Sequence, residues 1–161
     1  MDTTDADDRI IKLHLGAGKY HWPCGWDNLD EETDLKALPY LDNSVDEIQA
    51  IHLFEHFHRT DVEAYLAEWH RVLRPQGRLV MEMPSLDKIA RLIVGGETNI
   101  RLTMFGLFGD PREASPLMLH KWAWSNAELE SVLTEAGFAV EFEKPVFHIE
   151  KRDLRIVGRK I

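Results

Sequence analysis

The sequence predicts an α/β fold built on one open, mostly parallel sheet. Segments with strand character alternate with segments of helical periodicity along the 161 residues, and the last two strand-like segments follow one another without a helix. Such alternation is typical of a parallel sheet, whereas two strands joined directly run antiparallel. We therefore expect a mostly parallel sheet whose last strand is antiparallel.

The first two predicted strands lie close together in the sequence. Residues 10–15 (IIKLHL) and 26–29 are short segments of the kind found in buried parallel strands. Only GAGKYHWPCG separates them, and Pro23 and Gly25 interrupt this segment. Because a full crossover helix does not fit in so short a connection, we expect the first helix to be reduced to a loop.

The rest of the chain predicts five further strands and three helices. The strands are expected at residues 34–37, 45–53, 78–83, 138–143 and 154–159. The helices are expected at residues 60–73, 85–94 and 125–136, each beginning at a Ser or Thr that can cap it. Thr60 with Glu63 and Ser125 with Glu128 have the spacing of a capping box.

The composition is typical of one globular domain over residues 1–161, with 44% hydrophobic and 29% charged residues. No segment approaches the roughly 20 consecutive apolar residues of a membrane helix, and the acidic start MDTTDADD differs from a signal peptide. We therefore expect a cytoplasmic protein without membrane contact, in which residues 1–8 form a disordered tail. The single cysteine, Cys24, excludes an intrachain disulfide and a cysteine-based metal cluster.

The distribution of basic residues, more than the formal net charge of −9, argues against a nucleic-acid partner. Lys and Arg are scattered along the chain until the C-terminal KRDLRIVGRK, so we expect no broad basic surface for phosphates. A small-molecule or glycan-like partner agrees better with this charge pattern.

The first predicted strand runs directly into Gly16-Ala17-Gly18, and ligands of open α/β sheets bind at such strand ends. A dinucleotide site has a third glycine and a helix start, but here His21 and Pro23 follow, which disfavours a nicotinamide oxidoreductase. A nucleoside cofactor with an amino-acid tail needs only the glycine turn, and Asp30 can accept hydrogen bonds from its ribose hydroxyls. A plain tight turn remains the alternative interpretation.

The order of the segments resembles the class I S-adenosylmethionine-dependent methyltransferases, especially the broad group with an LPF…DNSFD and LEH signature. The resemblance covers nearly all of residues 10–159. It rests on HLGAGKY, WDNLD, DLKALPYLDNSVDEI, IHLFEHF and EWHRVLRPQGRLVMEMP. The resemblance implies a Rossmann-like fold and S-adenosylmethionine as the cofactor.

The resemblance also assigns residues to the cofactor. The glycine turn would line its methionine moiety, Asp30 would bind ribose, and His52 would lie beside the transferred methyl group. The full set of implied cofactor-binding residues is Leu15, Gly16, Ala17, Gly18, Lys19, Asp30, Asp34, Leu35 and His52.

Two histidines are the candidate catalytic residues. A neutral His52 at a strand end suits proton removal from a hydroxyl acceptor, with acceptor binding or a structural role as alternatives. His120 either joins it in the pocket or anchors the turn before the last helix. We expect His56 to be structural. We expect no metal, because His52 and His56 would face each other only in a helix, whereas residues 51–54 have strand character.

The sequence thus predicts a methyltransferase that acts on a small-molecule or glycan-like acceptor. The alternative is a non-catalytic subunit that binds S-adenosylmethionine or a partner protein. Residues 97–119, rich in Gly, Met and Phe, are expected to be an insertion that shapes the acceptor pocket or forms a packing surface in a homodimer.

Overall fold

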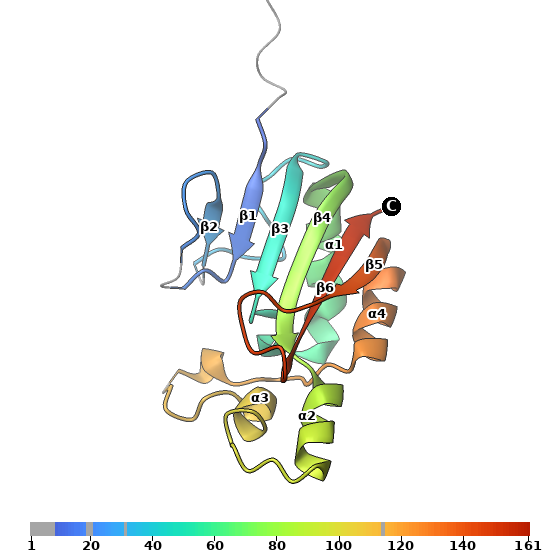
Figure 1. Cartoon of the computed structure of the whole chain (residues 1–161). Coiled ribbons are helices and arrows are strands. Elements are labelled where there is room, and N and C mark those ends of the chain that lie inside the picture. Colours follow the sequence, from blue (N-terminus) through green and yellow to red (C-terminus); the bar gives the residue numbers. More distant parts are fainter. Residues whose placement is uncertain (1–8, 19–20, 31, 114) are drawn as a thin grey trace, which may run out of the picture.

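The computed structural model describes residues 9–18, 21–30, 32–113 and 115–161, so the predicted tail at residues 1–8 lies outside it. Six strands form one sheet in the order β2-β1-β3-β4-β6-β5 (Figure 1). Their bounds are β1 Lys12–Leu15, β2 Asp27–Leu29, β3 Val45–Ile51, β4 Leu73–Pro84, β5 Phe138–Glu143 and β6 Asp153–Lys160. β1 to β4 pair in parallel, and β6 runs antiparallel between β4 and β5. The predicted fold class is confirmed.

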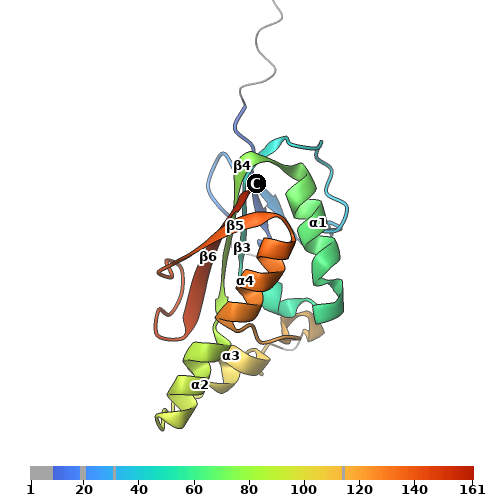
Figure 2. The same ribbon diagram turned by 90° about the vertical axis from the view of Figure 1, so that its right-hand side faces the viewer.

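Four α-helices and three short 3₁₀ turns complete the described structure. The helices are α1 Val62–Val72, α2 Leu86–Val94, α3 Met104–Phe108 and α4 Asn126–Glu135. The 3₁₀ turns are η1 Phe54–His56, η2 Arg59–Asp61 and η3 Pro116–Met118. α1 and α4 cover one face of the sheet, whereas α2 and α3 lie beyond the carboxyl end of β4 (Figures 1 and 2). None of the described helices has the length and hydrophobicity needed to span a membrane.

The face of the sheet under α1 and α4 carries the core. Leu13, Ile48 and Leu79 lie side by side in the strand register and are fully buried. Trp69 of α1 and Leu133 of α4 are equally buried and close the core from the helix side. Side chains at alternate positions of these strands must therefore point to the opposite face.

That opposite face is polar, which explains why it needs no helices. Lys12, Glu47 and Arg78 are neighbours in the register, and Arg78 lies 3.6 Å from Glu47 in an ion pair. Further along the same face, Arg155 of β6 pairs with Glu82 of β4 at 3.3 Å. Cross-strand ion pairs of this kind stabilise a sheet without an apolar cover.

The connection between β1 and β2 lies against this polar face. Among its described residues no helix forms, as the sequence predicts. The Trp22 ring stacks on His14 of β1 at 4.7 Å and contacts Phe147, at the same distance, in the loop between β5 and β6. Asn28 accepts a hydrogen bond from the Trp22 backbone and holds the loop in place.

Some predicted elements differ from the structure. The strand expected at residues 34–37 is a turn, because the Asp34 carboxylate accepts the Lys36 N–H and so competes with strand pairing. α1 begins at Val62, not at Thr60, and no side chain caps it. β4 begins at Leu73, before the expected residue 78. The caps at Ser85 and Ser125 are confirmed, since each side chain accepts an N–H from the first turn of its helix.

Candidate functional site

The candidate site lies where β1, β2 and β3 end side by side. Leu15 pairs with Leu29 on one side and with Ala50 on the other. Gly16, Asp30 and His52 follow these strand ends and therefore lie at one edge of the sheet. This is the edge at which ligands of open α/β sheets bind.

The glycine turn is closed against β2 and open toward solvent. The Ala17 N–H donates to the Leu29 carbonyl at 3.1 Å. Gly16 and Gly18 have φ values of +67° and +49°, in the left-handed region that favours glycine. A Cβ on Gly16 would lie 2.7 Å from Leu53 Cδ1, whereas a Cβ on Gly18 would meet no atom of the described residues within 4 Å. Packing therefore restricts Gly16, while the backbone around Gly18 has free space for a ligand.

The remaining predicted cofactor residues differ in their surroundings. Asp30 is half-buried, and its carboxylate makes no side-chain hydrogen bond to the described residues, so its oxygens can accept ligand hydroxyls. Asp34 is exposed, and the Leu35 carbonyl accepts the Trp69 indole N–H at 3.1 Å. Leu15 is fully buried, so only its backbone can reach a ligand. Lys19 lies outside the described residues.

His52 is held rigidly just after the end of β3. Its backbone has a φ of +50°, and its N–H donates to the Glu82 carbonyl at 2.7 Å. The ring lies between two buried carboxylates, with Nδ1 3.1 Å from Glu55 and Nε2 3.6 Å from Asp153. Burial alone would lower its pKa, but these two carboxylates raise the pKa of His52 to about 9.

This pKa disfavours a neutral His52 at pH 7. An imidazolium has no lone pair to accept a proton, so the geometry does not suit the general base that the sequence predicts. Asp153 stays ionised beside it. Although burial opposes the charged form, the ion pair with His52 and the hydrogen bonds from Arg152 lower the pKa of Asp153 to about 2.

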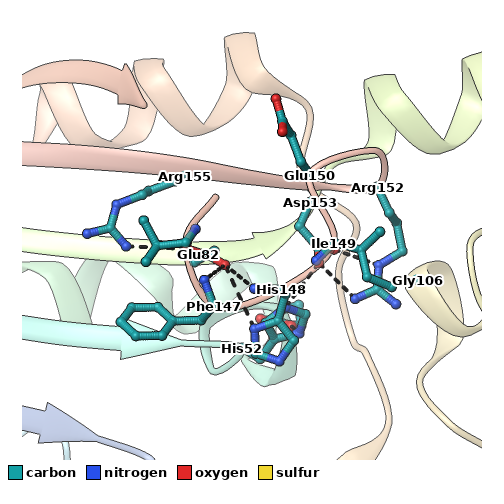
Figure 3. A network of polar contacts seen from close by, with 12 residues as sticks. His52, Glu82, Gly106, Phe147, His148, Ile149, Glu150, Arg152, Asp153 and Arg155 are labelled. Carbon is teal, nitrogen blue, oxygen red and sulfur yellow. Dashed lines mark hydrogen bonds and ion pairs between the residues drawn. The ribbon is translucent and has the colours of Figure 1, made fainter. Parts of the chain in front are cut away.

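The loop at residues 144–152 is tied to the site by a third buried carboxylate, that of Glu82 (Figure 3). Glu82 accepts backbone N–H groups from Val146, Phe147 and His148 at 2.8 to 2.9 Å. The His148 ring is thereby placed against His52, with ring centroids 3.9 Å apart. The loop thus covers His52 on the polar face of the sheet.

Sequence reasoning missed Glu82, Asp153 and His148. The one available signal was Glu82, a single acid within the otherwise apolar strand RLVMEMP. Nothing in the sequence indicates that the loop at residues 144–152 folds back on this acid, because the contact spans more than 60 residues.

His120 lies on the other side of His52, next to Glu55 and His56. The Glu55 carbonyl accepts the N–H groups of Lys121 and Trp122 at 2.8 and 3.3 Å, which joins the segment before α4 to η1. The His120 ring is 4.9 Å from the His56 ring. Burial lowers the pKa of His120, whereas the pKa of His52 is raised. Near pH 7 His120 is therefore neutral and His52 is protonated.

One hollow lies beside His120, and another lies away from the predicted site residues. The smaller, of about 310 Å³, is lined by Leu107, Phe108, His120, Lys121, Trp122 and Ala123. It therefore combines the segment expected to be an insertion with the segment around His120. The larger, of about 640 Å³, is an open groove beside α2, lined by Lys88, Arg91, Leu92, Glu150 and Lys151, and includes none of the predicted site residues.

One known protein family matches part of the chain. A profile of the family described as "Methyltransferase domain" matches residues 26–81, the part of the chain that carries β2, β3, α1 and most of β4. A search of curated proteins finds no significant match.

Three solved structures illustrate the structural similarity. The YcgJ protein from Bacillus subtilis is 15% identical, with a TM-score of 0.63 over 94% of this chain and 92% of that chain. A SAM-dependent methyltransferase from Methanosarcina mazei is 14% identical, with a TM-score of 0.62 over 94% and 92%. The 1,6-didemethyltoxoflavin-N1-methyltransferase from Burkholderia thailandensis, solved with bound 1,6-didemethyltoxoflavin and S-adenosylhomocysteine, is 15% identical, with a TM-score of 0.62 over 93% and 70%.

The matched segment resembles a methyltransferase domain, and the chain shares the Rossmann-like fold of these solved structures. One of these structures, the Burkholderia thailandensis enzyme, contains S-adenosylhomocysteine. The fold class expected from the sequence is confirmed, and the partial family match agrees with the expected resemblance.

Proposed function

We propose that the chain methylates a small-molecule or glycan-like acceptor bound in the hollow beside His120. The observation that carries this proposal is the hollow itself. Its volume of about 310 Å³ is at the lower end of the range for small-molecule pockets. The segment that lines it is hydrogen-bonded to Glu55, directly after the strand that ends at the cofactor edge.

The residues at this edge fit S-adenosylmethionine. The space that the described residues leave at Gly18 allows close approach of the amino-acid tail, and the Asp30 carboxylate, which makes no side-chain hydrogen bond among them, can accept the ribose hydroxyls. The turn at Asp34 and Leu35 follows β2 and is available to the adenine ring. Leu15 contributes its backbone alone.

When bound, S-adenosylmethionine supplies a methyl group that is already activated by the positive sulfur. The chain must then hold the acceptor close to that methyl group and exclude water. We assign acceptor contact to His120, which lines the hollow. We assign His52 a positioning role, because both of its ring nitrogens face carboxylates and its ring is covered by His148.

A two-stage experiment tests this proposal. Thermal unfolding with S-adenosylhomocysteine is compared with unfolding with NAD, and a ligand at 100 times its Kd should add about 2.7 kcal/mol to the free energy of unfolding. Formation of S-adenosylhomocysteine is then measured with panels of small hydroxylated and amino compounds, sugars and RNA. Turnover with a small compound or sugar supports the proposal. Cofactor binding without turnover on any panel favours the non-catalytic subunit, and turnover only with RNA contradicts the acceptor class.

A further inference from the structure

Three potential metal ligands meet beside the acceptor hollow. Glu55 and His56 belong to η1, and His120 comes from the segment before α4. One oxygen or nitrogen from each residue can be chosen such that all three atoms lie within 4.8 Å of one another. The backbone bonds from Lys121 and Trp122 to Glu55 hold the two segments together.

The two histidines present bare nitrogen atoms to this cluster. Nδ1 of His56 lies 3.1 Å from the Leu119 carbonyl, and Nδ1 of His120 lies 3.0 Å from the Gly106 carbonyl. Because a carbonyl oxygen only accepts, each Nδ1 must carry the hydrogen, which leaves Nε2 of the neutral ring with a free lone pair. Metal-binding histidines typically make this outer hydrogen bond to a backbone carbonyl.

Glu55 faces these nitrogens, and its charge is shared only with the His52 ring on its other side among the described residues. Its side chain is 2% exposed, and neither carboxylate oxygen has a hydrogen-bond partner among the described residues. Oε1 lies 3.1 Å from the His52 ring, within ion-pair distance but outside hydrogen-bond geometry, and 3.9 Å from Nε2 of His120. A buried carboxylate that faces the lone pair of a nitrogen is unfavourable unless a cation lies between them.

We propose that Glu55, His56 and His120 bind one divalent transition-metal ion, with Zn²⁺ as the first candidate. Two histidines and one carboxylate form a known three-ligand zinc set that leaves a coordination position open. Metal–ligand distances of about 2 Å require the three side chains to close in on the ion. The sequence-based expectation of no metal rested on a strand at residues 51–54, but the η1 turn directs His56 toward His120 instead of His52.

The proposed ion would also bear on catalysis, a consequence that rests on the proposed function. Its open position would adjoin the hollow that His120 lines. A hydroxyl acceptor on that position would release its proton to solvent more readily, because a bound cation lowers the pKa of a coordinated oxygen. The oxygen would form its bond to the methyl carbon as the S–C bond breaks, which leaves neutral S-adenosylhomocysteine. The ion would then supply the activation that a protonated His52 does not.

The binding test uses the untagged full chain, stripped with a chelator and free of cofactor and acceptor. Titration calorimetry with ZnCl₂ should give one ion per chain, and Co²⁺ should produce the visible absorption bands of a site with few ligands. His56→Ala, His120→Ala and Glu55→Gln should each weaken Zn²⁺ binding at least tenfold. The exposed neighbour His58→Ala serves as the matched control and should bind as the unmodified chain does.

Circular dichroism first establishes that each variant is folded. If His120→Ala is not folded, His120→Cys is tested in its place. A cysteine ligand should add a thiolate-to-Co²⁺ charge-transfer band. Absence of one-to-one binding to the unmodified chain would overturn the proposal, as would unchanged affinity in the folded variants or a His120→Cys spectrum without the new band. Because cofactor and acceptor are left out, these results are independent of whether the chain transfers methyl groups.

Discussion

The His52 ring lies 3.9 Å from the His148 ring, so the end of β3 and the loop between β5 and β6 meet at one point. The two rings differ in charge. Burial and the neighbouring charge of His52 lower the pKa of His148, whereas two carboxylates raise the pKa of His52 to about 9. A protonated ring thus lies against a neutral one at this point.

We predict that Glu82→Gln destabilises the fold by about 2 to 4 kcal/mol. Glu82 is fully buried and accepts three backbone N–H groups and Arg155, and the amide offers only one acceptor oxygen in place of two. Denaturant unfolding measures the change. Glu141→Gln on exposed β5 is the control and should change stability by less than about 0.5 kcal/mol. Equal effects in the two variants would contradict the anchoring role of Glu82.

We predict that Asp30→Asn weakens S-adenosylhomocysteine binding about tenfold or more with little change in stability. Hydrogen bonds to a charged group are worth about 1.5 to 3 kcal/mol, and within the described residues the Asp30 carboxylate supports no other side chain. Calorimetry gives the affinity, and Glu32→Gln, an exposed neighbour, is the matched control. An unchanged affinity in Asp30→Asn would remove Asp30 from the cofactor site.

We predict that His52→Asn lowers stability by about 2 to 4 kcal/mol. The variant keeps a residue that tolerates positive φ but removes the cation between the buried carboxylates of Glu55 and Asp153. With an active acceptor in hand, KM should rise at least as much as kcat falls. A general base would behave differently, with a fall in kcat of about 10²-fold or more and no loss of stability.

We predict that the Tyr40 phenol ionises only at unusually high pH. Burial and the hydrogen bond from its hydroxyl to Asp27, 2.9 Å long, raise the pKa of Tyr40 to about 12. Because the unfolded chain releases this proton near its ordinary pKa of about 10, the stability contribution is complete below pH 10 and is lost as the pH rises toward 12. Ultraviolet titration of the phenol follows the ionisation, and Asp27→Asn should shift it to lower pH. Titration of Tyr40 near pH 10 in the folded chain would show that this hydrogen bond is not formed.

Local signals explain what the sequence could predict. Ser85 and Ser125 each cap a helix through an N–H three positions ahead, and Pro23 and Gly25 prevent a helix between β1 and β2. The glycine turn is likewise local, and its place after β1 follows from the strand pattern.

Contacts between distant residues explain what the sequence could not predict. Glu55 and His120 meet only because the segment before α4 is hydrogen-bonded to η1. The charge of His52 depends on Asp153, which is about a hundred positions away in the chain and has no signal of its own. The strand predicted at residues 34–37 was wrong because the hydrophobic pattern does not reveal that Asp34 accepts the Lys36 N–H and forms a turn.

The most direct test of the account is an amide NMR titration of the ¹⁵N-labelled chain with S-adenosylhomocysteine. We predict saturable shifts centred on Gly16, Gly18 and Asp30, at the edge where β1 and β2 end. Absence of shifts, or shifts centred on the groove at Lys88 and Glu150 beside α2, would contradict the assignment of this edge as the cofactor site.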